Sequence, residues 1–387
     1  MKFLHTSDLH IGKKLDGVCR LDEQARVLKE ISQIAKDKEV DAVLISGDVF
    51  DTFIPSSDAE NLFFEFLNDL SEMNKTVICI SGNHDDADRL AASKALAEKR
   101  GIYLCSGNNC FTEKTFGGVS LVGQGKNHLV LKGEDGEEIF VATVPYFGEA
   151  PIGTAVDREK EFGDRVKDIF EEIFKDRKKE QSCIMLAHLF MLGGERSEGE
   201  RNIDLGGVKA VSPLAVPDFC LYTALGHLHK RQVVSRSRNI IYSGSPLQYA
   251  YDEVGLKKSV TVFEVKNGEL KSCSEVELLS GAKLAKVSVN GIESADGILS
   301  KFTDYFVDFT IISDRALAVE ETAMIKAKYP NVTKLKLELV SSGRGEGITG
   351  RRNLSDTDLF IEFYTKKYGS KPDEDIMSAF TEILEEE

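Results

Sequence analysis

The chain opens with a repeated pattern, in which a short apolar run ends in polar residues and an amphipathic segment follows. "KFLHTSDLH" precedes such a segment near 22–38, "DAVLISGDVFD" precedes one near 57–72, and "TVICISGNHDD" precedes one near 86–99. Apolar residues at spacings of three and four predict helices, and the short β-branched runs predict buried strands. We expect Ser56 or Ser57 to cap the second helix. The alternation predicts an α/β layered fold with a largely parallel sheet.

The pattern changes after the third unit. Short strand-like runs with glycine turns fill 102–145, and a charged helix is predicted near 158–178. Strand-like runs then return, among them "SCIMLAHLF", "LYTALGHLH" and "KSVTVFEV". The mixture of parallel and later strands predicts two sheets packed face to face, a β-sandwich flanked by helices, over residues 1–279.

Two further segments follow this predicted sandwich. Residues 280–342 alternate strand-like runs with helical patterns near 294–303 and 318–328, which predicts a small α+β domain. Residues 343–387 predict a Gly- and Arg-rich linker followed by two short helices. The G-x-G-x-x-G match "GEGITG" is interpreted as part of this linker, because the residues after it do not begin a helix.

Composition limits the class of protein. The chain is 42% hydrophobic and 29% charged, as is typical of soluble globular proteins, and it contains no apolar run long enough to span a membrane. Its seven cysteines form no CxxC motif, and Cys79 and Cys183 lie in apolar runs, which indicates reduced, buried thiols in a cytoplasmic protein. A net charge of −15 argues against nucleic-acid binding, unless bound cations hold the phosphate locally.

Candidate metal ligands follow five of the predicted strands, in "SDLH", "SGDVFD", "SGNHDD", "LAH" and "LGHLH". Sites in layered α/β folds lie at the carboxyl ends of strands, so these side chains are expected to meet. Gly47, Gly82 and Gly226 stand beside them and would allow close approach of the backbone. Oxygen and nitrogen donors without thiolates suit Mn²⁺, Fe²⁺ or Zn²⁺ better than Ca²⁺ or Mg²⁺. The candidates are Asp8, His10, Asp48, Asp51, Asn83, His84, His188, His227 and His229.

Each of these residues also has a plainer interpretation. A single histidine at a strand end is commonly a hydrogen-bonded structural residue, and an aspartate after a glycine is commonly a turn residue. However, six of the seven histidines lie in or beside these segments, which favours a joint site. His5 is interpreted as a core histidine or a partner of a ligand, and His128 as a solvated turn residue. Lys13 fits either a phosphate contact or a solvated surface.

The motifs "DLH", "GDVFD", "GNHD", "AH" and "GHLH", in this order, resemble those of the calcineurin-like metallophosphoesterases. "ERNIDLGGVKAVSP" and "YSGSPLQYAYDE" are similar to the members of that superfamily that serve as nuclease subunits beside an ATPase. The resemblance implies two divalent metal ions, most commonly Mn²⁺, bridged by Asp48. The implied ligands of one metal are Asp8, His10, Asp48 and His229, and those of the other are Asp48, Asn83, His188 and His227.

The resemblance also implies a catalytic residue that is not a ligand. His84 would stabilise the transition state or assist the leaving oxygen. Many relatives carry a histidine three residues beyond the bridging aspartate, where this chain has Asp51, so that auxiliary role is not implied here.

The activity implied by the resemblance is a metal-dependent DNA nuclease of repair, recombination and replication, acting on duplex ends, single strands and hairpins. The segment 280–342 would be a capping domain. A coiled-coil ATPase would be the partner and would bind the ATP, because this chain has no Walker motif. The resemblance also implies two copies of each subunit. Helices within 355–387 would dock the ATPase or pack on their own domain, and helices near 57–72 and 86–99 are candidates for a homodimer contact.

Two other functions remain as alternatives. One is a phosphoesterase of the same fold that acts on phosphoproteins or cyclic nucleotides. The other is a non-catalytic scaffold that retained the fold, which metal content and turnover would distinguish from an enzyme.

Overall fold

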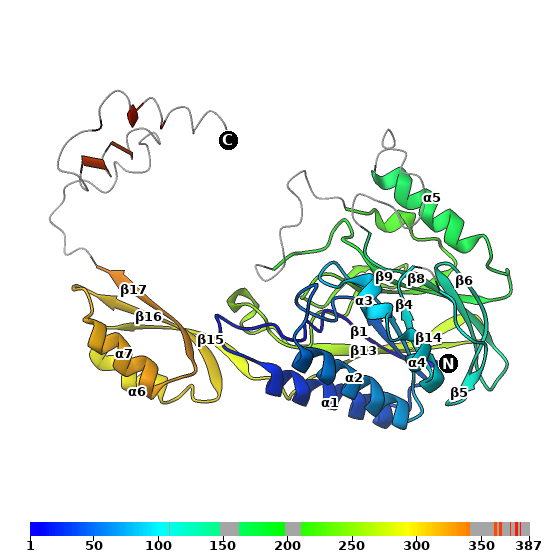
Figure 1. Cartoon of the computed structure of the whole chain (residues 1–387), viewed down its shortest axis with the longest axis horizontal. Helices are drawn as coiled ribbons and strands as arrows, with labels where there is room; N and C mark the ends of the chain where they lie inside the picture. Colours follow the sequence, from blue (N-terminus) through cyan, green and yellow to red (C-terminus); the bar gives the residue numbers. More distant parts are fainter. Residues whose placement is uncertain are drawn as a thin grey trace. The chain divides into compact units, whose positions relative to one another are not determined.

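The computed structural model of the chain describes residues 1–107, 109–147, 162–197 and 210–340 (Figure 1). It also describes eight isolated positions of the C-terminal tail, which are residues 360, 361, 364, 365, 372, 376, 377 and 380. Met1–Ile312 together with Leu317–Glu338 form one compact unit, and Ser313–Ala316 with Leu339–Glu387 belong to a second. The "GEGITG" segment and the predicted linker and tail helices of 343–387 lie outside the described residues, apart from those eight positions.

The first sheet has six strands in the order β14-β13-β1-β2-β3-β4. Its strands are β1 (Lys2–Thr6), β2 (Ala42–Ser46), β3 (Thr76–Ile80), β4 (Ile102–Cys105), β13 (Ser259–Lys266) and β14 (Glu269–Glu277). Neighbours among β1 to β4 are parallel, whereas β13 is antiparallel to β1 and to β14. The carboxyl ends of β1, β2 and β3 therefore lie at one edge, directly before the candidate ligands of their loops.

Helices α1 (Leu21–Asp37) and α2 (Ser57–Glu72) cover the outer face of this sheet (Figure 1). Their apolar stripes pack on the strands, and the Ser56 hydroxyl accepts a hydrogen bond from the Ala59 amide, which identifies Ser56 as the cap.

The single helix expected near 86–99 is instead three short pieces. These are α3 (Ala87–Ala91), α4 (Lys94–Ala97) and the 3₁₀ turn η1 (Glu98–Arg100). Within them only Leu90 and Ala91 are buried, so no continuous apolar stripe holds a longer helix against the sheet.

The second sheet has eight strands in the order β11-β12-β10-β9-β8-β7-β6-β5. Its strands are β5 (Thr115–Phe116), β6 (Val119–Gly125), β7 (His128–Lys132), β8 (Glu138–Val144), β9 (Ser182–His188), β10 (Cys220–Gly226), β11 (Gln232–Ser235) and β12 (Ile240–Tyr242). The run β8, β9, β10, β12 is parallel, and β5 to β7 form antiparallel hairpins beside it. Short 3₁₀ turns occur at η2 (Pro213–Ala215) and η3 (Tyr251–Glu253).

The two sheets pack face to face, with a shared core of side chains from both, including Phe3, Leu44, Leu129, Ile184 and Tyr222. Helix α5 (Phe162–Phe174) covers the outer face of the second sheet through Val166, Phe170 and Ile173. The predicted two-sheet sandwich with flanking helices is thus confirmed, and it brings the ends of strands from two different sheets together.

The third sheet consists of β15 (Lys283–Asn290), β16 (Tyr305–Ser313) and β17 (Val332–Leu339), in that order. Helices α6 (Ala295–Leu299) and α7 (Val319–Lys328) pack on it, with the turn η4 (Ile292–Ser294) leading into α6. This α+β element has a core of its own around Phe309, Leu299 and Ile325. Helix α6 is shorter than the predicted helix near 294–303.

All seven cysteines are free, and Cys79 and Cys183 are buried as predicted. The Sγ atoms of Cys183 and Cys220, on neighbouring strands, are 3.6 Å apart. None of the helices in the described part of the chain combines the length and the hydropathy that a membrane crossing requires.

The two histidines set apart in the sequence are both buried. His5 lies in β1, where its ring nitrogens are 3.0 Å from the Tyr222 hydroxyl and 3.1 Å from the Leu225 carbonyl oxygen, as expected of a core histidine. His128 is not the solvated turn residue that its polar neighbours suggest. It begins β7 and stacks on Phe140 of β8, with ring centroids 4.5 Å apart.

His5 should make the stability of the protein depend on pH. Burial lowers the pKa of His5 to about 3, so below pH 6.5 the unfolded chain takes up a proton that the folded chain does not. The contribution of His5 to the free energy of unfolding is therefore complete above pH 6.5. It is lost as the pH falls toward 3, by about 1.4 kcal/mol per pH unit.

We expect urea denaturation in EDTA to show this slope as a difference between wild type and His5→Gln. Glutamine retains polar atoms for Tyr222 and Leu225 but does not titrate. The free energy of unfolding of the variant, relative to that of wild type, should therefore increase as the pH falls from 7.5 to 5. A constant difference across that range would contradict the role assigned to His5.

Candidate metal centre

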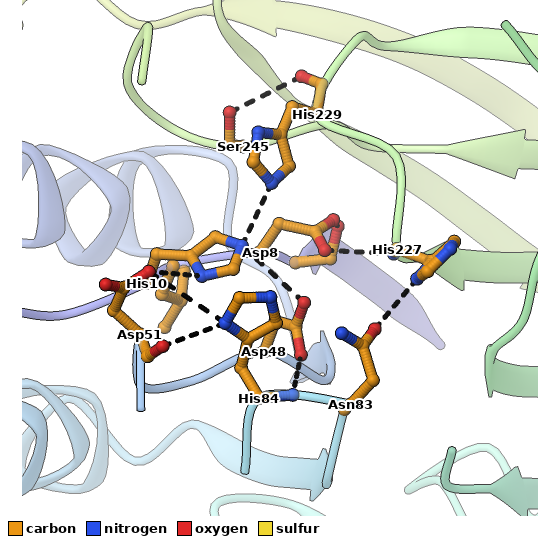
Figure 2. A network of polar contacts seen from close by, with 12 residues as sticks. Asp8, His10, Asp48, Asp51, Asn83, His84, His227, His229 and Ser245 are labelled. Atoms are coloured by element: carbon orange, nitrogen blue, oxygen red, sulfur yellow. Dashed lines mark hydrogen bonds and ion pairs between the residues drawn. The ribbon is translucent and has the colours of Figure 1, made fainter. Parts of the chain in front are cut away.

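Seven side chains converge where the carboxyl ends of five strands from both sheets meet, and Figure 2 labels all of them except His188. They follow β1, β2 and β3 of the first sheet, end β9, or follow β10 of the second sheet. We call them the ligand cluster, and they are Asp8, His10, Asp48, Asn83, His188, His227 and His229. All are buried except His227, which is half-buried.

The backbone at this edge is strained. Asp8, His10, Asp48 and His227 have positive φ angles of 52°, 44°, 50° and 115°, which residues with a Cβ rarely adopt. Hydrogen bonds from the Asp8 amide to the Gly47 carbonyl and from the His10 amide to the Asp48 carbonyl, both 3.0 Å, hold the first two loops together. Strain of this kind concentrates at functional sites, where the surrounding structure maintains it.

Glycines allow the loops to approach one another. A Cβ on Gly82 would lie 2.2 Å from the amide nitrogen of Asp48, and one on Gly226 would lie 2.0 Å from the Ser46 carbonyl oxygen. A Cβ on Gly47 would lie 2.5 Å from Nδ1 of His188. The close approach expected at these three glycines is confirmed.

The Asp48 carboxylate lies between the two halves of the cluster. Its Oδ2 is 3.5 Å from Nε2 of His10 on one side and 3.5 Å from Nε2 of His188 on the other. Its Oδ1 accepts a hydrogen bond from the His84 amide at 2.9 Å. Two groups of potential donor atoms, each within 4.8 Å of one another, share this residue: His10, Asp48 and His84, and Asp8, Asp48 and His188.

The remaining members join one half or the other. Nε2 of His229 is 3.0 Å from Nε2 of His10, and Oδ1 of Asn83 is 2.8 Å from Nδ1 of His227 (Figure 2). Oδ1 of Asn83 is also 2.8 Å from Nε2 of His188. The His227 amide donates to Oδ1 of Asp8 at 2.9 Å, which joins the loop after β10 to the loop after β1.

Burial keeps these histidines neutral. It lowers the pKa of His188 to about 3, and together with the neighbouring histidines it holds the pKa of His10 and His227 well below the usual range. Nδ1 of His188 is 2.8 Å from the Ser46 carbonyl oxygen, which can only accept, so this nitrogen carries the proton. The lone pair of His188 is therefore on Nε2, the atom that faces Asp48 and Asn83.

The buried carboxylates of the site would be stabilised in their charged form by a nearby cation. Burial raises the pKa of Asp48. Burial, with the charge of Asp48, also raises the pKa of Asp85 to about 7, although Asp85 accepts hydrogen bonds from the Val49, Phe50 and Gly82 amides. Neutral imidazole nitrogens and carboxylate oxygens that converge on one place, without thiolates, fit divalent cations. The donors present therefore suit the metal ions that the sequence predicts.

His84 lies beside the cluster with one nitrogen already engaged. Its Nδ1 is 2.8 Å from the Asp51 carbonyl oxygen and 3.9 Å from an Asp51 carboxylate oxygen. The same carboxylate oxygen is 3.5 Å from Nδ1 of His10 and 3.1 Å from Nζ of Lys13. Asp51 thus contacts Nδ1 of two histidines, His10 and His84.

Two residues that the sequence did not point to lie next to the ligand cluster, on the side of His229 that faces away from His10. Glu253 and Lys258 are buried and form an ion pair next to His229. Burial alone would raise the pKa of Glu253, but Lys258 and His229 lower it to about 2. Asp85 was also missed, although its position directly after "GNH" was a signal that could have drawn attention to it.

Comparison with known proteins gives a consistent result. The family model of the calcineurin-like phosphoesterases matches residues 1–231. The D subunit of the nuclease SbcCD from Bacillus subtilis (strain 168) is 33% identical, over 99% of this chain and 97% of that protein. The protein of the same name from Rhodobacter capsulatus is 31% identical, over 69% of this chain and 67% of that one.

Two solved structures are also similar in part. A Thermus thermophilus protein aligns with a TM-score of 0.38 and 14% identity, covering 71% of this chain and 98% of that one. A dimetal phosphatase from Danio rerio aligns with a TM-score of 0.39 and 11% identity, covering 72% of this chain and 98% of that one.

Proposed function

Because the chain belongs to the calcineurin-like phosphoesterases, and within them to the SbcD nuclease subunits, we propose that it cuts DNA at duplex ends, single strands and hairpins. The family relationship identifies the chain as a metal-dependent nuclease, which is a phosphodiester hydrolase. The observation that carries the proposal is the convergence of the ligand cluster around Asp48.

The ligand cluster divides into two sets of donors that share Asp48. We assign Asp8, His10, Asp48 and His229 to one metal ion and Asp48, Asn83, His188 and His227 to the other. The 3.0 Å approach of His10 to His229 supports the first set, and the 2.8 Å contacts of Asn83 with both His188 and His227 support the second. The mixed oxygen and nitrogen donors suit Mn²⁺, Fe²⁺ or Zn²⁺, and of these we propose Mn²⁺, the ion that the family resemblance implies.

The chemistry that two bound divalent cations supply is activation of water at neutral pH and neutralisation of charge on the phosphodiester. The protein side chains do the rest. The Asp51 carbonyl accepts a hydrogen bond from Nδ1 of His84 and so orients the ring. We assign to Nε2 the contact with a phosphate oxygen or the protonation of the leaving oxygen. The Asp51 carboxylate favours a positive charge on that ring while Nε2 carries the proton that it donates.

Local positive charge is needed because the chain as a whole carries −15. Lys13 lies at the edge of the cluster, where it pairs with Asp51, and Lys230 and Arg231 directly follow His229. A DNA backbone would therefore be held near the metal ions, while it is repelled by much of the remaining surface.

The partner proposed for this chain is an SbcC-type ATPase, in a heterotetramer with two copies of each subunit. The relatives are named as one of the two kinds of chain in an SbcCD nuclease, which supports this, as does the absence of a Walker motif from the chain. Helices within 355–387 are the proposed dock for the ATPase. Residues 280–342 are the proposed capping domain, and the segments near 57–72 and 86–99 are the proposed homodimer contact. The protein would be a cytoplasmic enzyme of DNA repair and recombination. Undiminished co-purification with the ATPase after removal of 355–387 would contradict the assignment of the dock.

The proposed substrate is tested with a labelled hairpin DNA and a small phosphodiester, each with Mn²⁺ and with or without the ATPase. We expect hairpin cleavage that EDTA abolishes, and an exonuclease activity on duplex ends that increases with the ATPase and ATP. Hydrolysis of the small phosphodiester or of a phosphoprotein without cleavage of DNA would instead favour another phosphoesterase activity.

A further inference from the structure

The nitrogen of His229 that faces away from the ligand cluster is directed at a carboxylate that the proposed mechanism does not use. Its Nδ1 is 3.7 Å from Oε1 of Glu253, slightly longer than a direct hydrogen bond, and the Glu253 side chain is fully buried. The other nitrogen, Nε2, is directed at His10 at 3.0 Å (Figure 2). Because a carboxylate only accepts hydrogen bonds, this arrangement favours a proton on Nδ1 and a lone pair on Nε2.

Glu253 is itself fixed in place. Its Oε1 accepts hydrogen bonds from the Tyr249 and Ala250 amides, both at 3.1 Å, where the chain turns into η3. Its Oε2 is paired with Nζ of Lys258, a side chain that is only 8% exposed. The carboxylate therefore has little freedom to turn away from His229.

Lys258 also binds the backbone of the histidine. Its Nζ donates to the His229 carbonyl oxygen at 2.8 Å and to Oγ of Ser245 at 2.9 Å. The Ser245 amide donates to the same carbonyl oxygen at 3.0 Å (Figure 2 shows Ser245 beside His229). One ammonium group thus joins the carboxylate behind the ring to the main chain that carries the ring.

We propose that Glu253 is a positioning residue for His229, and that Lys258 holds Glu253 in the orientation this requires. The pair sets the tautomer and the direction of the ring, so that Nε2 presents a lone pair to a metal ion before that ion arrives. Lys258 offsets the charge of Glu253, so the pair acts through geometry and not through added negative charge. This inference rests on the proposed function, because His229 is a ligand only if the site binds metal.

The effect is confined to one half of the ligand cluster. His188, in the other half, is oriented by the Ser46 carbonyl, which is a backbone group of β2. Substitution of Glu253 should therefore weaken the binding of one metal ion and leave the binding of the other unchanged. The weakened ion is the one assigned to Asp8, His10, Asp48 and His229.

Two double variants separate the acceptor from the charges. Glu253→Gln with Lys258→Met retains an oxygen that can face Nδ1 and removes both charges. Glu253→Met with Lys258→Met removes the acceptor at similar volume. The matched control is Glu277→Gln with Lys257→Met, which removes a neighbouring exposed ion pair of 2.8 Å. Thermal unfolding in EDTA reports whether each variant folds, and Mn²⁺ titration calorimetry reports the number and affinity of sites.

We expect wild type, the control and the Gln/Met variant to bind two Mn²⁺ ions with similar affinities. The Met/Met variant should bind one ion as wild type does and the other about 10- to 100-fold more weakly. Two sites of unchanged affinity in a folded Met/Met variant would overturn the positioning role. A wild-type protein that binds no Mn²⁺ would overturn the proposed function instead, so the two failures are distinguishable.

A measurement on the unaltered chain does not depend on the variants folding. Long-range ¹H–¹⁵N spectra of the metal-free protein, with the His229 signals identified by their loss in His229→Gln, report which ring nitrogen is protonated. We expect the proton on Nδ1. A proton on Nε2 in the metal-free protein would overturn the inference.

Discussion

Replacing Asp48 with alanine will lower Mn²⁺-dependent cleavage of hairpin DNA by at least ~10³-fold, because both metal ions lose the ligand they share. Asp48 is the residue that contacts histidines of both halves, at 3.5 Å on each side. Mn²⁺ titration should show the loss of tight binding at both sites, whereas removal of a ligand from one half would weaken one site.

The fold should survive this substitution. Burial raises the pKa of Asp48, so its charge is costly in the folded protein, and its loss removes a single hydrogen bond from the His84 amide. Asp48→Asn retains an oxygen for that amide and should be equally inactive. Asp308→Asn, at a buried carboxylate in β16, is the matched control and should retain activity. Substantial cleavage by a folded Asp48→Ala protein would remove the bridging role.

Replacing His84 with glutamine will lower kcat for the same substrate by about 10²- to 10⁴-fold while two Mn²⁺ ions remain bound. The reason is that Nδ1 of His84 is held by the Asp51 carbonyl, and we assign the action on the phosphate to Nε2. Glutamine fills similar space but does not transfer a proton at neutral pH.

The metal content of this variant decides between two roles for the same ring. His84 lies within 4.8 Å of donor atoms of His10 and Asp48, so its position alone is compatible with ligation. Loss of one Mn²⁺ on substitution would show that His84 is a ligand and that the catalytic assignment is wrong. His128→Gln, at a buried histidine stacked on Phe140, controls for the loss of any buried imidazole.

The errors in the prediction from sequence came from contacts between distant segments. His128 stands among polar residues in the sequence, yet β7 pairs with β8 and places Phe140 against its ring. The region near 86–99 has apolar residues at helical spacing, but the sheet buries only two of them, and the helix breaks. Neither outcome is encoded within the local window that a periodicity argument uses.

Glu253 shows the same limit at the site. Nothing in "YDEVGLKK" resembles a ligand motif, and its acidic and basic residues are typical of a solvated turn. Only the packing of η3 behind the end of β10 places this carboxylate against His229 and closes the pair with Lys258.

The sequence by itself determined which side chains stand at strand ends, because a buried strand and its polar terminus are local patterns of a few residues. It thereby indicated the sandwich, the nine candidate ligands and the glycines that let their loops approach. Only the tertiary structure decided which of these groups face one another and which nitrogen of each ring is directed inward. Those features depend on the order of strands in two sheets and on backbone carbonyls and carboxylates far away in the chain, so no local pattern contains them.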